Sequence, residues 1–290
     1  MEKAVSFSFL SAMFLGWSIV IGTVVAKVLP PVAFIAVAYV ASFFFIVVLS
    51  SFSKKPFQGK EIIRLFKRDF LILFLFRGIL GSIFFIYGFS LTTGVRASFI
   101  PLIEPAFVLF FSWMVGKEAV RRKKISLLAL LVLGSYLFIT NGASIFDQLF
   151  WGDLLIMIGV LCYSASYLPA AKISEKVNPQ SIMAMVNGLS GLFFLFVGFP
   201  FLGALASLTK FDAFLLLAFI ITGPVVGIFL WYKAMKVIAP WVVSSLLTIQ
   251  VLAGALLAFF WLGQILLPLQ LAGGMLMLLS AFLISKEAGR

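Results

Sequence analysis

Apolar residues fall into ten blocks along the chain, each close to 20 residues long and separated by short polar or proline-containing breaks. A helix needs about 20 apolar residues to cross roughly 30 Å of hydrocarbon, so each block predicts one membrane-spanning helix. Turn-forming pairs such as Pro30-Pro31, Asn178-Pro179 and Ala239-Pro240 mark the breaks. The predicted helices are residues 5–26, 31–51, 69–91, 95–116, 125–141, 152–172, 180–201, 211–233, 240–262 and 267–285. The pattern predicts an all-α membrane protein.

Composition supports the membrane class. The chain is 63% hydrophobic and 11% charged, whereas soluble domains are roughly 45–50% apolar and about 25% charged. A membrane β-barrel would show short alternating segments instead of long apolar runs. The first block, Val5 to Ala26, is too long for a signal-peptide core, so we expect it to be retained. The longest connection, Lys54 to Arg68, predicts an amphipathic helix at the membrane surface.

The net charge of +12 raises the question of nucleic-acid binding, but the positions of the charges argue against it. If the N-terminus is cytoplasmic, 18 of the 22 Lys and Arg lie in cytoplasmic segments. Only Lys27, Arg96 and Lys210 lie on the other side, and Arg77 lies within a helix. Cytoplasmic loops of membrane proteins carry this excess of positive charge. The bias predicts a multi-pass protein of the plasma or inner cell membrane with both termini in the cytoplasm.

The two halves of the chain resemble each other at an offset of about 145 residues. Gly16-Trp17-Ser18 corresponds to Cys162-Tyr163-Ser164, and Tyr87 corresponds to Tyr232. We therefore expect two five-helix repeats, residues 1–145 and 146–290. Because five is odd, the second repeat would enter the membrane from the opposite side. Such inverted repeats are typical of secondary transporters, whose substrate site lies near the midplane between the halves, so we expect a central cavity.

The stretch from Arg77-Gly78 through Tyr87-Gly88 and Glu104-Pro105 to Gly116-Lys117-Glu118 resembles the EamA-type branch of the drug/metabolite transporter superfamily. The resemblance extends over the whole chain as two five-helix units. It implies a ten-helix fold with a central cavity and the transport or export of small organic metabolites. The chain departs from the family pattern at three places. It lacks an arginine in the second helix, and it has Gln250 where proline is common and Gln264 where glutamate is common.

Two charged residues are predicted to lie within the membrane. Glu104 is the one carboxylate near the middle of a predicted helix, and an ionised carboxylate there is costly unless it is paired, hydrated or protonated. It is either a proton-titrating or substrate-contacting group, or part of a fixed ion pair or backbone cap. Arg77 has either a site role or a structural pairing. Because a very short turn joins their two helices, we expect Arg77 and Glu104 to be energetically coupled.

Aromatic and amide side chains complete the predicted site. Trp17 and Tyr163 occupy equivalent mid-helix positions, where a polar ring atom needs a partner, but packed bulk is the alternative. Polar side chains also join helices to one another, which is the alternative reading of the amides. Pro101, Pro105 and Gly223-Pro224 break helices at membrane depth and can mark a site or a simple kink. The predicted substrate-binding residues are Trp17, Arg77, Tyr87, Glu104, Tyr163, Asn187, Tyr232 and Gln250.

The function predicted from these observations is alternating-access transport, as an exporter or exchanger. One cation and one anion leave the site near zero charge, which favours a neutral or zwitterionic metabolite such as an amino acid. Phosphate esters would need several Lys or Arg. The alternatives are a membrane-embedded enzyme, which the absence of histidine argues against, and a channel or accessory subunit. We expect no cofactor and no metal. Expected partners are the lipid bilayer, a small metabolite and, as a candidate coupling ion, the proton, in a monomer or homodimer.

Overall fold

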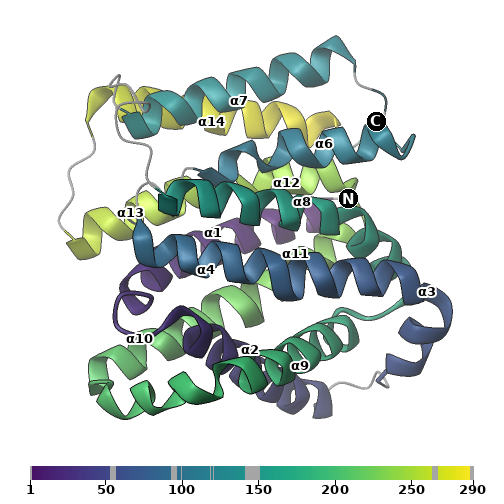
Figure 1. The fold of residues 1–290 in the computed structure, drawn as a ribbon. Helices are drawn as coiled ribbons and strands as arrows, with labels where there is room; N and C mark the ends of the chain where they lie inside the picture. The colour runs from purple at the N-terminus through teal and green to yellow at the C-terminus, as the bar shows by residue number, and fades with distance from the viewer. Residues whose placement is uncertain are drawn as a thin grey trace.

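The structure is a computed structural model. It describes residues 2–52, 57–92, 97–98, 100–117, 119, 121–140, 151–262 and 267–287, and within these ranges all regular structure is helical (Figure 1). The all-α prediction is thereby confirmed. The α-helices are α1 (Glu2–Val25), α2 (Pro31–Ser51), α3 (Gly59–Leu73), α4 (Ser82–Leu91), α6 (Glu104–Met114), α7 (Arg122–Thr140), α8 (Trp151–Lys176), α9 (Pro179–Gly198), α10 (Lys210–Ile220), α11 (Ile228–Met235), α12 (Pro240–Leu247), α13 (Gln250–Leu262) and α14 (Pro268–Glu287). The tighter or wider helical turns are η1 (Phe74–Gly81), η2 (Ile100–Ile103), η4 (Phe199–Ser207) and η5 (Ile221–Gly227).

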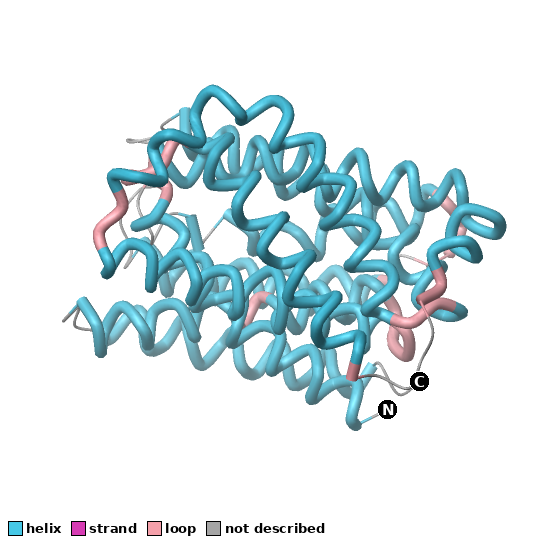
Figure 2. Tube along the Cα trace, turned by 90° about the horizontal axis from the view of Figure 1, so that it is seen from below, coloured by secondary structure: helices cyan, strands magenta, loops and turns pink. Residues whose placement is uncertain are grey.

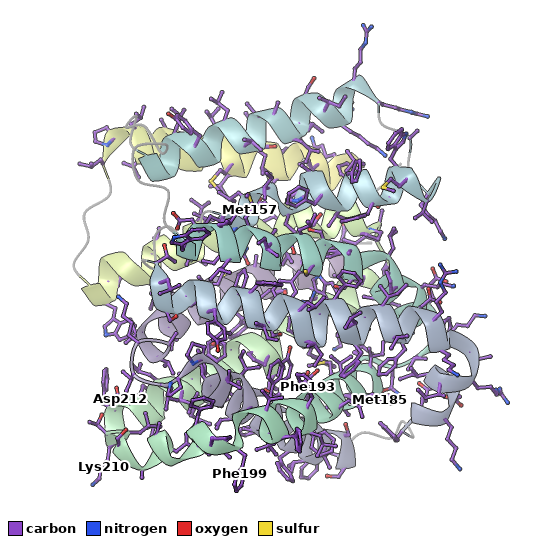
Figure 3. The ribbon with its side chains drawn as sticks, viewed as in Figure 1. Met157, Met185, Phe193, Phe199, Lys210 and Asp212 are labelled. Carbon is purple, nitrogen blue, oxygen red and sulfur yellow. The ribbon has the colours of Figure 1, made fainter. Side chains whose placement is uncertain are left out.

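Seven helices in the described part of the chain are long and apolar enough to cross a membrane. They span Glu2–Val25, Pro31–Ser51, Gly59–Leu91, Trp151–Lys176, Pro179–Ser207, Lys210–Met235 and Pro240–Leu257. Shorter apolar helices occupy Ile100–Met114 and Leu271–Ile284. Large apolar side chains cover the outside of the bundle, as Phe199 does at its edge with 73% of its surface exposed (Figure 3). Such a surface suits lipid. The count of ten membrane-spanning helices stays a prediction.

The third predicted helix differs from its predicted boundaries. Instead of a surface segment followed by a helix at 69–91, the chain is helical from Gly59 to Leu91 and bends at Phe66, whose φ is −133° and ψ is 26°. Ile62 and Phe66 are buried, whereas Ile63 and Leu65 are exposed, which is the amphipathic pattern predicted for this stretch. The middle of the helix, η1, has the wider π-helical turn. A π-turn adds one residue without changing composition, so the sequence pattern did not reveal it.

Two predicted helices are broken where polar side chains occur. The fourth passes through the 3-10 turn η2 and becomes α-helical again at Glu104, the first residue of α6. The ninth divides into α12 and α13, and Gln250 is the first residue of α13. The breaks therefore lie 146 residues apart, which is close to the repeat offset. Each break places a polar residue at the start of a half-helix.

Helices from the two halves pack in pairs. α2 packs on α9, α7 on α14, and α6 on α12. α4 packs on α8, and α1 packs correspondingly on η5 and α11. Figures 1 and 2 show α1 beginning and α14 ending at the same end of the bundle, and Figure 3 places Lys210 and Asp212 at the opposite end.

The buried apolar side chains form two main clusters rather than one. The first includes Phe66, Tyr167, Trp231 and Trp241 from α3, α8, α11 and α12. The second includes Phe34, Phe89, Ile156 and Phe219 from α2, α4, α8 and α10. Phe74 in η1 packs against both clusters. A cavity lined by residues of both clusters lies between them.

Candidate functional site

The space between the clusters is a cavity of about 170 Å³. Its polar lining comes from both halves of the chain, and its apolar lining includes Phe34, Phe89 and Phe219 of the second cluster. Six of the eight predicted site residues line it, namely Arg77, Glu104, Tyr163, Asn187, Tyr232 and Gln250. The lining also includes four hydroxyl side chains that were not among the predicted site residues, those of Ser18, Tyr39, Ser82 and Tyr167.

The other two predicted site residues, Trp17 and Tyr87, are not among the residues that line this cavity. Trp17 packs edge-on against Phe14, with ring centroids 5.5 Å apart, and the next residue along α1, Ser18, lines the cavity in its place. Tyr87 is 37% exposed on α4. Consecutive helical residues differ by about 100° in direction, so an error of one residue turns a predicted cavity residue away from the site.

Arg77 lies in the π-helical segment η1 and enters the cavity lining from there. Its guanidinium carbon lies 4.0 Å from the centre of the Trp231 ring and 5.2 Å from that of Tyr163. An arginine over aromatic faces gains cation–π attraction, which partly replaces lost hydration. Among the described residues, no carboxylate forms an ion pair with Arg77 within 4.0 Å. The guanidinium hydrogen-bonding groups thus remain available to a bound anion.

Two hydroxyl groups meet at the backbone of Arg77. Ser82 Oγ donates to the Arg77 carbonyl oxygen at 3.0 Å, and Tyr39 Oη lies 3.4 Å from the same oxygen. The two hydroxyl oxygens are 2.5 Å apart. A tyrosine in a phenylalanine-rich apolar helix was the signal that could have found this contact, because a buried hydroxyl needs a partner.

Glu104 is 8% exposed at the first position of α6. Tyr167 donates a hydrogen bond from its hydroxyl to Glu104 Oε2 at 3.0 Å. The ring of Tyr167 packs edge-on against Trp231, with centroids 5.0 Å apart. Glu104 and Arg77 are therefore linked through the Tyr167–Trp231 pair, and a direct ion pair between these two described residues is absent.

Asn187 on α9 contributes an amide to the cavity and is 6% exposed. Its side-chain nitrogen is buried and makes no hydrogen bond to the protein. A buried donor without a partner costs about 1–3 kcal/mol, so its retention at a cavity suits a ligand acceptor. Lys233, by contrast, packs over Phe7 and Phe229 and is not a lining residue. Arg77 is the one cation among the described residues that line this cavity.

The comparisons with known proteins decide the family. The model of the EamA-like transporter family matches the chain twice, over residues 2–140 and 150–286. The chain belongs to the EamA-like transporter family. An uncharacterized transporter of Methanothermobacter thermautotrophicus is 24% identical over 243 residues, which is 82% of this chain and 70% of the relative. A crystal structure of another protein is similar over 100% of this chain and 99% of that one, with a TM-score of 0.78 and 15% identity.

This EamA-like transporter is accordingly a multi-pass membrane protein, and the resemblance seen in its sequence is confirmed. Within the described residues, no group of three or more His, Cys, Asp or Glu side chains could hold a metal ion. The cavity lining presents one guanidinium, one carboxylate, two amides and several phenolic hydroxyls. These groups can recognise a small solute that carries charges of both signs.

Proposed function

We propose that this EamA-like transporter carries small neutral or zwitterionic metabolites, such as amino acids, by alternating access as an exporter or exchanger. The observation that carries the proposal is that Arg77 and Glu104 line one cavity without pairing directly with each other. Two buried opposite charges that are held apart cost more than a closed pair unless each finds another partner. A zwitterion supplies both partners at once.

The proposed binding mode follows from these positions. A substrate carboxylate would receive parallel hydrogen bonds from the Arg77 guanidinium. A substrate ammonium group would lie toward Glu104, and Asn187 would donate to a remaining oxygen. The apolar lining that includes Phe34, Phe89 and Phe219 would accept an uncharged side chain. The cavity of about 170 Å³ is smaller than the roughly 300–1,000 Å³ of pockets for drug-sized ligands, which favours a compact solute.

The proposed architecture is ten membrane-spanning helices in two inverted repeats, residues 1–145 and 146–290. The packing supports it, because exchanging the halves converts the contact of α4 with α8 into that of α11 with α1. The π-helical turns η1 and η5 and the breaks at Glu104 and Gln250 also correspond. Helix breaks at membrane depth commonly form the substrate sites of secondary transporters.

We further propose a plasma or inner membrane location with both termini cytoplasmic, which the positions of 18 of the 22 Lys and Arg support. That α1 begins and α14 ends at one end of the bundle also supports it. The lipid bilayer surrounds the transporter in this proposal, and the proton is a candidate coupling ion through Glu104. A monomer and a homodimer both fit.

The test begins with thermal unfolding of the purified transporter in detergent against the 20 common amino acids, sugar phosphates and nucleotides. We expect zwitterions to raise the melting temperature and phosphate esters to leave it unchanged. The stabilising compound is then measured by counterflow in proteoliposomes. Saturable uptake accelerated by internal substrate supports a carrier, whereas flux linear in concentration indicates a channel. Tight binding of a phosphate ester would refute the proposed substrate class.

A further inference from the structure

The turn that carries Arg77 is a π-helical turn and departs from the regular α-helix. In this wider turn the carbonyl oxygen of Phe76 lies so close to Gly81 that a Cβ there would be 2.7 Å away. The same Cβ would also collide with the ring of Tyr163. π-Turns are rare in proteins overall, and those that occur are often found at functional sites. They interrupt the regular i→i+4 hydrogen bonds of the helix. Side chains that hydrogen-bond the displaced carbonyls therefore help to decide where the turn forms.

Ser82 and Tyr39 supply such hydrogen bonds at the carbonyl of Arg77. Each hydroxyl has one proton to donate. The hydroxyl oxygens of Ser82 and Tyr39 lie 3.0 Å and 3.4 Å from the Arg77 carbonyl oxygen and 2.5 Å from each other, so one of them donates to the carbonyl while the other donates to its partner hydroxyl. Both side chains line the cavity, so the pair holds the backbone of Arg77 from the side that faces the solute.

The Tyr39 ring is itself held in place. It stacks on Phe194 of α9, with centroids 6.1 Å apart and ring planes 5° from parallel. Because α2 packs along α9, the position of the hydroxyl is set by two helices that belong to different halves of the chain. The Tyr39 hydroxyl therefore connects the backbone of η1 to the packed pair of helices α2 and α9.

We propose that Tyr39 and Ser82 are positioning residues for Arg77. They hold the carbonyl of Arg77 in the π-turn, and the turn directs the guanidinium over Trp231 and Tyr163 into the cavity. Without them the turn relaxes toward an α-helix, and the guanidinium leaves the Trp231 ring. That Arg77 binds substrate rests on the proposed function, whereas its placement over Trp231 does not.

The other half of the transporter provides a matched control. In η5, Ser11 Oγ of α1 donates to the carbonyl oxygen of Gly227 at 2.7 Å. Ser11 is fully buried and makes the same kind of hydrogen bond as Ser82, from a serine hydroxyl to a carbonyl of the π-turn. Unlike Ser82, it does not line the cavity. Ser11→Ala should therefore cost stability as Ser82→Ala does while leaving Arg77 in place.

The test uses fluorine NMR of the full-length protein labelled with 5-fluorotryptophan, without added ligand. The Trp231 resonance, assigned by its loss in Trp231→Phe, reports the guanidinium 4.0 Å from its ring. Arg77→Gln gives the shift of the uncovered ring. We expect Tyr39→Phe and Ser82→Ala to move the Trp231 resonance at least halfway to that position and Ser11→Ala to leave it unmoved.

A double-variant measurement separates positioning from general disturbance. In the Arg77→Gln background, Tyr39→Phe should no longer move the Trp231 resonance. An unchanged resonance in the Tyr39→Phe single variant, or an equal shift with and without Arg77, would overturn the proposal. Tyr39→Phe keeps the ring stack and decides the matter alone if Ser82→Ala does not fold. Because no substrate is needed, failure here leaves the counterflow test of the proposed function intact.

Discussion

The two π-helical turns η1 and η5 occupy corresponding places in the two halves, yet only one of them carries a charge. In both, a glycine packs close to the carbonyl five residues before it: Gly81 near Phe76, and Gly227 near Thr222. In both, a buried serine hydroxyl donates to a carbonyl of the turn. In η1 the turn presents Arg77 to the cavity, and in η5 it presents Gly223 and Pro224. Both halves thus have the π-helical turn, but only the turn of the first half carries a charged side chain.

The broken helices show the same difference. Glu104 and Gln250 each begin a half-helix and each line the cavity, but only the first is ionisable. The second half contributes the aromatic groups around the charges, with Tyr163 and Trp231 beside Arg77 and Tyr167 bonded to Glu104. The family model matches each half, and the halves share their helix pairings, but the first half provides the charges and the second provides the aromatic rings beside them.

The largest expected effect comes from removing the charge of η1. Arg77→Gln should weaken zwitterion binding by about 10–100-fold, because a hydrogen bond to a charged group contributes about 1.5–3 kcal/mol. The matched change in η5, Thr222→Val, removes a hydroxyl bonded to the Ala218 carbonyl and should change affinity less than about threefold. Affinity is measured by isothermal titration with the compound found in the thermal screen. Equal losses in the two variants would contradict the assignment of charge recognition to the first half.

Arg77 and Glu104 should prove coupled although they form no direct ion pair. Removing one buried charge leaves the other uncompensated, so Arg77→Gln and Glu104→Gln together should destabilise less than the sum of the single changes. We expect a coupling energy of about 0.5–3 kcal/mol, measured by thermal unfolding in detergent. Tyr167→Phe should reduce this coupling, because Tyr167 joins Glu104 to Trp231. Additive losses would mean that the two charges act separately, and Gln250→Leu, at the corresponding break, serves as the uncharged control.

The glycines of the two π-turns should be equally intolerant of a side chain. A Cβ at Gly227 would lie 2.8 Å from the Thr222 carbonyl and 2.9 Å from the side chain of Leu15, as Gly81 meets Phe76 and Tyr163. Overpacking of this kind costs about 1–3 kcal/mol. Gly81→Ala and Gly227→Ala should therefore lower the melting temperature by similar amounts. Substrate affinity should fall further in Gly81→Ala, since only that change displaces a ring beside Arg77. A melting temperature unaffected by Gly227→Ala would break the equivalence of the turns.

The helical class could be predicted from the sequence because the length of an apolar run is set by the thickness of the membrane and not by the packing of individual side chains. The second helix, bounded by Pro30-Pro31, was placed at residues 31–51, where the structure has it. Pro101, Pro105 and Gly223-Pro224 predict interruptions where the structure has η2 and η5, whereas the π-turn η1 and the break before Gln250 were missed. A π-turn adds one residue, which alters neither composition nor apolar length. That shift also rotates every side chain on one side of it. Tyr87 follows the π-turn η1, whereas Trp17 lies in the uninterrupted helix α1; neither lines the cavity, and Tyr39 and Tyr167 were overlooked within apolar runs.

The smallest expected effect on stability comes from two surface substitutions, which test whether the two halves are inverted in the membrane. Lys27 and Lys172 correspond at an offset of 145 residues, and both are exposed. Lys172 forms one ion pair with Asp69 at 2.7 Å, and Lys172 is 55% exposed. An exposed pair of this kind contributes about 0–1 kcal/mol, so Lys172→Cys should leave the fold intact. In a Cys162→Ala background, single cysteines at the two positions should react with a membrane-impermeant maleimide from opposite faces. Inside-out and right-side-out vesicles distinguish the faces, and labelling of both positions from one face would mean that the halves are not inverted.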